Sequence, residues 1–164
     1  MLLIDAANVV GSRPNGWWRD RPGAAHTLVA QLRQAVEAGR LPSPVVVVLE
    51  GVARRGAASG EEGGVSVLHA PGGGDDLMVT VVAEAVADEA SPADATGLTA
   101  EASPVARGAR GAQAARAARG TQNTQIARIT LVSADRALGD RVRALGASVV
   151  GPRWLLERLE NEAG

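Results

Sequence analysis

The sequence predicts an α/β fold, a three-layer αβα arrangement with a mostly parallel central sheet of about five strands. Four segments are continuous, apolar and rich in β-branched residues, which is typical of strands buried on both faces. Segments with the spacing of helices that bury one face fill most of the gaps between them. Strands that alternate with helices favour a parallel sheet covered by helices.

Each element has its own signal in the sequence. The strands are expected at residues 2–5, 45–50, 65–69 and 128–133, with a shorter candidate at 147–150. Helices are expected over about 28–39, 75–87 and 138–146, and from Pro152 onward. Glycine is a common end for a helix, and proline is favoured in the first turn. Residues 60–64 (GEEGG) are expected to form a turn between two strands.

The 164 residues are expected to form a single domain, 1–164, interrupted by one insertion. Residues 88–125 lack Val/Ile/Leu periodicity and are dominated by Ala, Gly, Ser, Thr and Arg. Such a segment buries too little apolar surface to offset the entropy of ordering, so we expect it to be disordered. Its second half is basic. Two roles stay open for it, an RNA-contacting arm or a low-complexity loop that the fold tolerates.

Composition excludes several classes of active site. All 17 basic residues are arginine, and the chain has no lysine and no cysteine. A thiolate zinc site, a cysteine nucleophile, a Walker P-loop and a Schiff-base lysine are therefore excluded. The formal net charge is −1. The short apolar stretch at the N-terminus is unlike a signal peptide or a membrane span, so we expect a cytoplasmic protein that does not enter a membrane.

Acidic residues follow the predicted strands, at the point where each strand ends. Parallel strands end at the same edge of their sheet, so these side chains are expected to converge there. Asp75, Ser133 and Asp135 have an alternative explanation as helix-capping or first-turn residues, worth about 1 kcal/mol each. Several carboxylates at one edge repel each other, and a hard divalent cation relieves that repulsion. The polar residues at this edge are Asp5, Asn8, Glu50, Asp75, Asp76, Asp135 and Asp140.

Three motifs at successive strand ends carry a family resemblance: D-x-x-N from Asp5, DD from Asp75, and S-x-D ending at Asp135. Through these motifs the chain is similar to an NYN domain of the PIN-like nuclease superfamily. The similarity extends over the segments LLIDAANVV, VVVVLEG, GGGDDLMVTVVAEA and ITLVSADRALGDRVRALGASVVGPRWLLERL. The resemblance implies a parallel sheet flanked by helices and cleavage of RNA that depends on Mg²⁺ or Mn²⁺. It implies catalytic roles for Asp5, Asn8, Asp76 and Asp135. It implies metal ligands at Asp5, Asp75, Asp76 and Asp135, with Glu50 and Asp140 as further candidates.

The chain departs from the family pattern at one position. Many PIN domains carry a second acid two residues after the S/T-x-D aspartate, and here that residue is Ala137. Asp140, on the next helical turn, is the candidate substitute. One bound metal ion and two both stay open.

The loop at residues 11–23 combines arginine with tryptophan beside the same edge. Arginine contacts phosphates and tryptophan stacks on unpaired bases, so this combination is typical of proteins that bind single-stranded nucleic acid. The alternative is that one tryptophan packs into the core beneath the loop. The predicted RNA-binding residues are Arg13, Trp17, Trp18, Arg19 and Arg21.

The function that best fits these residues is that of an endoribonuclease, which hydrolyses RNA phosphodiester bonds through a carboxylate-held Mg²⁺ or Mn²⁺. The alternative is a catalytically weak or inactive RNA-binding module of the same fold. A toxin-like nuclease under a protein partner's control is a third hypothesis, and a homodimer stays open. A phosphatase is more distant, because the chain lacks a D-x-D-x-[TV] motif and its lysine. We expect no ligand role for His26 or His69.

Overall fold

The computed structural model describes residues 1–90 and 129–160. These residues form a six-stranded sheet in the order β3-β4-β2-β1-β5-β6, in which only β3 runs antiparallel to its neighbour. The strands are β1 Leu2–Asp5, β2 Val45–Leu49, β3 Gly60–Glu62, β4 Val65–His69, β5 Thr130–Val132 and β6 Ser148–Val150. The predicted α/β fold with a mostly parallel sheet is confirmed.

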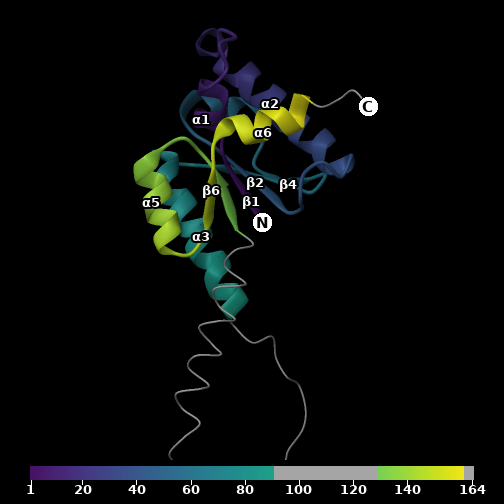
Figure 1. The fold of residues 1–164 in the computed structure, drawn as a ribbon. Helices are drawn as coiled ribbons and strands as arrows, with labels where there is room; N and C mark the ends of the chain where they lie inside the picture. The colour runs from purple at the N-terminus through teal and green to yellow at the C-terminus, as the bar shows by residue number, and fades with distance from the viewer. Residues whose placement is uncertain (91–128, 161–164) are drawn as a thin grey trace, which may run out of the picture.

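Helices cover both faces of the sheet, so the three-layer arrangement is confirmed as well (Figure 1). One face carries α1 (Ala6–Gly11), α2 (Arg21–Glu37) and α6 (Pro152–Glu160), and the other carries α3 (Gly74–Ala90) and α5 (Arg136–Ala144). Two 3-10 helices, η1 (Trp17–Arg19) and η2 (Gly51–Gly56), complete the described elements. Within residues 1–90 and 129–160, no helix has the length and apolar character needed to cross a membrane.

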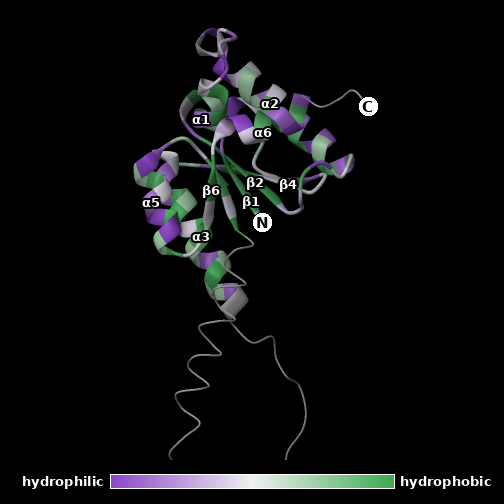
Figure 2. Ribbon diagram, in the orientation of Figure 1, coloured by the Kyte–Doolittle hydropathy of each residue, from purple (hydrophilic) through white to green (hydrophobic). Residues whose placement is uncertain are grey.

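Each face of the sheet buries its own hydrophobic core. Successive side chains of a strand point to opposite faces. In β1, Leu2 and Ile4 therefore pack with Leu28 of α2, whereas Leu3 packs with Met78 of α3. Figure 2 shows hydrophobic residues along the strands and on the helix surfaces turned toward them. This two-sided burial is the reason that β1 and β2 are apolar at nearly every position.

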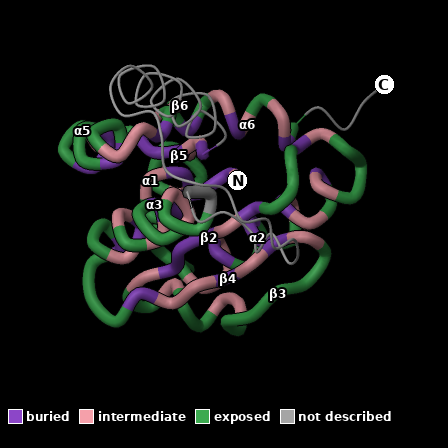
Figure 3. Tube along the Cα trace, turned by 90° about the horizontal axis from the view of Figure 1, so that it is seen from below, coloured by how far each residue is buried: buried purple, intermediate pink, exposed green. Residues whose placement is uncertain are grey.

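The prediction of a turn over residues 60–64 is wrong in its first half. Residues Gly60–Glu62 form β3, an antiparallel edge strand in which Glu61 pairs with Ser66. Only Gly63 and Gly64 make the turn, and their positive φ angles of 59° and 73° explain why glycine is needed there. All of β3 is exposed at the edge of the sheet (Figure 3), so the segment carries no apolar signal.

The helices differ from the prediction mainly at their ends. α2 begins at Arg21 rather than near residue 28, because the side chain of Asp20 accepts a hydrogen bond from the Gly23 backbone N–H at 2.9 Å. The short helix α1 was not predicted. α3 continues to Ala90, so residues 88–90 belong to this helix and not to the insertion. The rest of the predicted disordered insertion, residues 91–125, lies outside the described residues.

Gly56 lies where η2 meets α2, and it leaves no room for a side chain. A Cβ atom there would collide with the carbonyl oxygen of Pro22 and lie 2.9 Å from the backbone nitrogen of His26. We expect Gly56→Ala to lower the free energy of unfolding by about 1–3 kcal/mol, because backbone atoms cannot move aside cheaply. Urea denaturation measures the change. Gly72→Ala is the control, since its Cβ meets nothing within 4 Å; equal losses in both variants would contradict the prediction.

Candidate active site

Asp5 is a buried carboxylate at the carboxyl end of β1, with only 4% of its surface exposed. Its Oδ1 atom accepts a hydrogen bond from the backbone N–H of Asn8 at 3.0 Å, which caps α1. Its Oδ2 atom accepts from Asn8 Nδ2 at 2.9 Å and from Ser133 Oγ at 2.8 Å. Three donors thus offset the cost of burying this charge and hold the carboxylate in one orientation.

The hydrogen bond between Asp5 and Ser133 joins β1 to β5 at the point where the strand order reverses. β2 and β4 lie on one side of β1, and β5 and β6 lie on the other. Open α/β sheets bind their ligands outside the carboxyl ends of the strands at such a switch point. The fold therefore places Asp5 where a ligand is expected.

Asp135 is coupled to Asp5 through the same serine. Ser133 Oγ accepts a hydrogen bond from the backbone N–H of Asp135 at 3.0 Å while it donates to Asp5. Asp135 Oδ1 accepts from the backbone N–H of Leu138 at 2.9 Å and caps α5. The capping interpretation of Asp135 is thus confirmed, and its Oδ2 atom accepts no hydrogen bond from the described residues.

Glu50 connects the end of β2 to the start of α3. Its Oε2 atom accepts a hydrogen bond from the backbone N–H of Gly74 at 2.6 Å. A Cβ on Gly74 would lie 3.1 Å from that same oxygen, so glycine permits the close approach of the carboxylate to the backbone. This contact brings Glu50 to the first turn of α3, next to Asp75.

Asp75 lies in the electrostatic field of the other three carboxylates. Partial burial raises its pKa above the ordinary value, and the negative charges of Asp135, Asp5 and Glu50 raise this pKa further. Arg141 acts in the opposite direction. The four carboxylates therefore lie near enough to each other at one edge for the charges of three of them to act on Asp75.

Asp76 and Asp140 have partners outside this group. Asp76 Oδ1 lies 2.7 Å from Arg141 Nη2, and its side chain is 89% exposed. Asp140 pairs with Arg143 at 3.1 Å along α5. The structure thus brings together Asp5, Glu50, Asp75 and Asp135, with Asn8 beside Asp5, whereas Asp76 and Asp140 bind arginines of α5. Metal binding by Asp76 and Asp140 stays a prediction.

The donor types at this edge suit a hard divalent cation, because every candidate ligand is a carboxylate or amide oxygen. The negative charges of Asp135, Asp5 and Glu50 add to the effect of burial in raising the pKa of Asp75. Among residues 1–90 and 129–160, however, no three Asp, Glu or His side chains stand in the arrangement of a metal-binding group. The donor set suits such an ion by its chemistry, and the described side chains are not gathered around one position.

The loop after α1 divides its aromatic and basic residues between two environments. Trp17 is half-buried and Trp18 is 57% exposed, and their rings meet edge to face with centroids 6.3 Å apart. The guanidinium of Arg21 lies 5.4 Å from the Trp17 ring centroid. Arg19 is exposed at the end of η1. These four residues lie in or beside one short segment, as the sequence spacing suggested.

Arg13 is turned inward from this loop. Its Nη2 atom donates to Gln31 Oε1 of α2 at 3.0 Å, and burial lowers its pKa while Glu160 raises it. Its Nε atom is buried without a hydrogen-bond partner. Arg13 therefore binds α2 through one end of its guanidinium, and its contact with RNA stays a prediction.

Two residues of the site were not assigned a site role from the sequence. Ser133 was considered only as a capping residue, yet it is 3% exposed and holds Asp5 and Asp135 together. Its place as the serine of S-x-D was the available signal. Arg141 pairs with Asp76, 65 positions earlier in the chain, and nothing in the local sequence indicates that contact.

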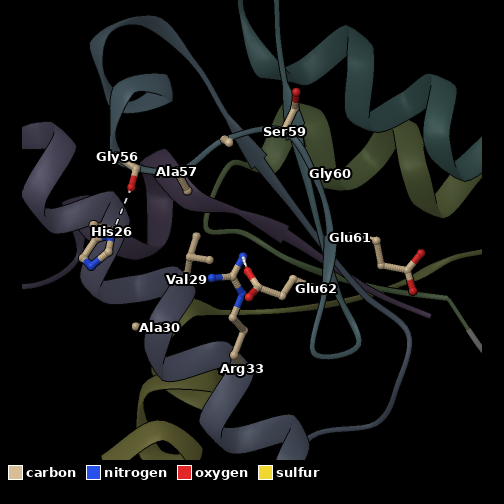
Figure 4. A pocket seen from close by; sticks show the side chains of 11 residues that line it. His26, Val29, Ala30, Arg33, Gly56, Ala57, Ser59, Gly60, Glu61 and Glu62 are labelled. Atoms are coloured by element: carbon tan, nitrogen blue, oxygen red, sulfur yellow. Dashed lines mark hydrogen bonds and ion pairs between the residues drawn. The ribbon is translucent and has the colours of Figure 1, made fainter.

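A separate polar cavity of about 490 Å³ lies between α2 and residues 56–62 (Figure 4). Arg33 of α2 reaches Glu62 of β3 at 2.8 Å, and His26 Nδ1 donates to the Gly56 carbonyl oxygen at 3.2 Å. Glu61 points away from this pair in the same view. None of the predicted site residues lines the cavity, and two strands separate β3 from β1.

Comparison with known proteins supports the fold. The crystal structure of a mutant of Rae1 (YacP) from Bacillus subtilis is similar, with a TM-score of 0.53 and 15% sequence identity. The match covers 97% of this chain and 73% of that chain. No protein-family model and no curated protein sequence matches this chain. At such low identity, the likeness establishes a shared fold.

Proposed function

We propose that this protein is an endoribonuclease that uses carboxylate-held Mg²⁺ or Mn²⁺ to hydrolyse RNA phosphodiester bonds. The observation that carries the proposal is the convergence of Asp5, Glu50, Asp75 and Asp135 at the switch point of the sheet. Excess negative charge there would repel a phosphodiester unless a cation were bound. The resemblance of the strand-end motifs to an NYN domain, and a fold consistent with the PIN-like type, support the same conclusion.

In this proposal each residue of the site has a distinct task. Asp5, Asp75 and Asp135 would hold the ion, and Glu50 would complete the negative edge. A bound Mg²⁺ or Mn²⁺ supplies a Lewis acid for a phosphate oxygen and lowers the pKa of a coordinated water. Asn8 and Ser133 donate to Asp5 and fix its orientation, so they are positioning residues. No covalent nucleophile is required.

An RNA-binding module without catalysis is the second candidate function. One observation favours it: the carboxylates of the described residues do not stand in a ready metal-binding arrangement, since Asp135 and Glu50 each bind a backbone N–H. The exposed arginines and tryptophans of the loop would serve either function.

Metal dependence distinguishes the two candidates. We expect the full-length protein to cleave labelled single-stranded RNA with Mg²⁺ or Mn²⁺, to lose cleavage in EDTA, and to regain it when metal is restored in excess. Electrophoresis of the products measures cleavage, and anisotropy of the same RNA measures binding in parallel. Cleavage that EDTA leaves unchanged would exclude the metal mechanism. Binding without cleavage in either metal would favour the RNA-binding module.

A further inference from the structure

The 3-10 helix η2 forms a ridge beside the carboxylate edge and separates two hollows. Glu50 follows β2 and precedes η2, and Gly51 then turns the chain with a positive φ of 53°. Gly51 and Val52 line the hollows on both sides, so Val52 stands at the crest. Its side chain is 49% exposed, although valine is apolar.

The hollow on one side is small and mainly apolar. It has a volume of about 170 Å³, below the roughly 300–1,000 Å³ of pockets that hold drug-sized ligands. Trp17 forms part of its wall, with Ala6, Val10 and Ala53, and Glu50 and Arg21 supply its charged groups. A single planar ring suits a pocket of this size and lining.

Two large hydrophobic side chains, Val52 and Trp18, are exposed among the described residues. Val52 lines this pocket, and Trp18 contacts the Trp17 ring edge to face. An exposed aromatic ring beside an aromatic pocket wall offers an unstacked base a further surface for stacking. The Arg21 guanidinium near the Trp17 ring adds positive charge at the same place.

The hollow on the other side of the ridge is open and basic. It has a volume of about 550 Å³ and is lined by Arg54, Arg55 and His69 together with Gly51 and Val52. Arg54 Nε donates to the Gly51 carbonyl oxygen at 3.0 Å, and His69 Nε2 donates to the Ala57 carbonyl oxygen at 2.8 Å. Within residues 1–90 and 129–160, neither Arg54 nor Arg55 pairs with a carboxylate. Their charge is therefore available to an anion.

We propose that a single RNA strand crosses the ridge at Val52, with one unstacked base in the Trp17 pocket and neighbouring phosphates on Arg54 and Arg55. The inference rests on the proposed function for the identity of the ligand as RNA. It assigns the second half of the interface to η2, whose arginines did not stand out in the sequence. Base stacking on an aromatic ring together with arginine along the backbone is how single strands are bound without strict sequence preference. Glu50, shared with the carboxylate edge, places the crossing beside the proposed cleavage site.

The binding of phosphates by Arg54 and Arg55 is tested by the salt dependence of RNA affinity. We measure binding of a fluorescent single-stranded RNA by anisotropy, in EDTA so that no cleavage intervenes, over a series of salt concentrations. Arg54→Ala/Arg55→Ala is expected to reduce the slope of log K against log salt by about 1.4, since each phosphate contact on a single strand contributes about 0.7. Arg143→Ala/Arg153→Ala on α5 and α6 removes the same charge and is expected to leave the slope unchanged. Equal slopes for both double variants would overturn the assignment.

The base pocket at Trp17 is tested by comparing two oligomers, one with bases and one without, on the natural protein and on its variants. The natural protein is expected to bind normal RNA about 5- to 150-fold more tightly than an oligomer of equal length that has riboses and phosphates but no bases. Trp17→Ala is expected to lose most of this preference, whereas Arg54→Ala/Arg55→Ala keeps it. A preference that survives in Trp17→Ala would overturn the base pocket, even if that variant is less stable, because both oligomers are compared on the same protein.

These measurements separate the inference from the proposed function. Normal metal-dependent cleavage with unaltered binding in all variants would leave the nuclease in place and reject the crossing at η2. Binding that depends on Trp17, Arg54 and Arg55, in a protein that cleaves no RNA with either metal, would support the crossing and reject the nuclease.

Discussion

Asp5→Asn is expected to reduce RNA cleavage by about 10²–10³-fold and to lower the free energy of unfolding by about 1–3 kcal/mol. Both effects originate in the same buried carboxylate. Loss of one anionic ligand weakens the hold on a cation whose stabilisation of the reacting phosphate is worth several kcal/mol. The effect on stability follows from hydrogen bonding alone.

An amide in place of the Asp5 carboxylate can satisfy the surrounding groups only if they rearrange. The carboxylate accepts from the backbone N–H of Asn8 through one oxygen and from Asn8 Nδ2 and Ser133 Oγ through the other. If the oxygen of the new asparagine stays on the backbone N–H, its NH₂ group faces Asn8 Nδ2 and Ser133 Oγ, so the Asn8 amide must turn to present its oxygen and the Ser133 hydroxyl must turn to accept. All three hydrogen bonds then lose the charge that strengthens them. The opposite orientation leaves the backbone N–H of Asn8 without an acceptor, which is costly.

Single-turnover cleavage and urea denaturation of Asp5→Asn measure the two effects. Glu157→Gln is the matched control, because it makes the same change from carboxylate to amide at an exposed residue paired with Arg153. We expect the control to stay within about 0.5 kcal/mol of the natural protein and to retain its activity. A folded Asp5→Asn protein with full activity would refute the role of Asp5. An equal loss of activity in Glu157→Gln would show that the effect is not specific to the carboxylate edge.

The sequence predicts best those elements whose signal is burial. β1 and β4 have the predicted bounds, and β2 ends one residue earlier than predicted, because strands buried on both faces must be apolar throughout. β3 was missed because all three of its residues are exposed and its pairing depends on β4. α1 and η2 are each a six-residue element, too short for a helical period to emerge. Yet both frame the candidate site.

The sequence allows the prediction that carboxylates converge at this edge, but it does not identify all of the residues that take part. Parallel strands bring their ends to one edge whatever the loops do, so Asp5, Glu50 and Asp135 were expected there. Asp75 and Asp76 are neighbours in sequence, and a helix turns them about 100° apart. Which of the two faces the site is set by how α3 packs on the sheet, and Asp76 instead reaches Arg141 of α5. Such a long-range contact leaves no mark on the local sequence.

Asp75→Asn is expected to have opposite effects on stability and on activity. Burial and the charges of Asp135, Asp5 and Glu50 raise the pKa of Asp75 in the folded protein, so its ionised form costs free energy at neutral pH. A neutral amide removes this cost, so the metal-free variant is expected to be more stable by a few tenths of a kcal/mol. The gain is small because the side chain is exposed and solvent screens its charge. Cleavage is expected to fall by about 10²-fold, since the cation would lose a ligand that has no competing hydrogen bond among the described residues.

The pH dependence of the stability gained in Asp75→Asn tests the direction in which folding shifts the pKa of Asp75. The raised pKa means that the folded protein holds the Asp75 proton more tightly than the unfolded chain does. Its contribution to stability is therefore fully present below the ordinary value of 3.8 and is lost as the pH rises through the folded-state pKa. The stability difference between Asp75→Asn and the natural protein should accordingly be largest at neutral pH, shrink as the pH falls and vanish below pH 3.8. Urea denaturation at a series of pH values measures it.

Asp76→Asn is the control for Asp75→Asn, because it alters the adjacent residue in the same way. Asp76 pairs with Arg141 through an exposed contact, so the variant is expected to lose a small amount of stability and to show no gain at neutral pH. Addition of Mn²⁺ separates the two further. A cation that binds the folded state raises its stability, and that increase should be smaller in Asp75→Asn than in the natural protein. If Asp76→Asn instead lost both the response to Mn²⁺ and the cleavage activity, Asp76 would be the ligand, and the α3 side chains would have to rearrange when metal binds.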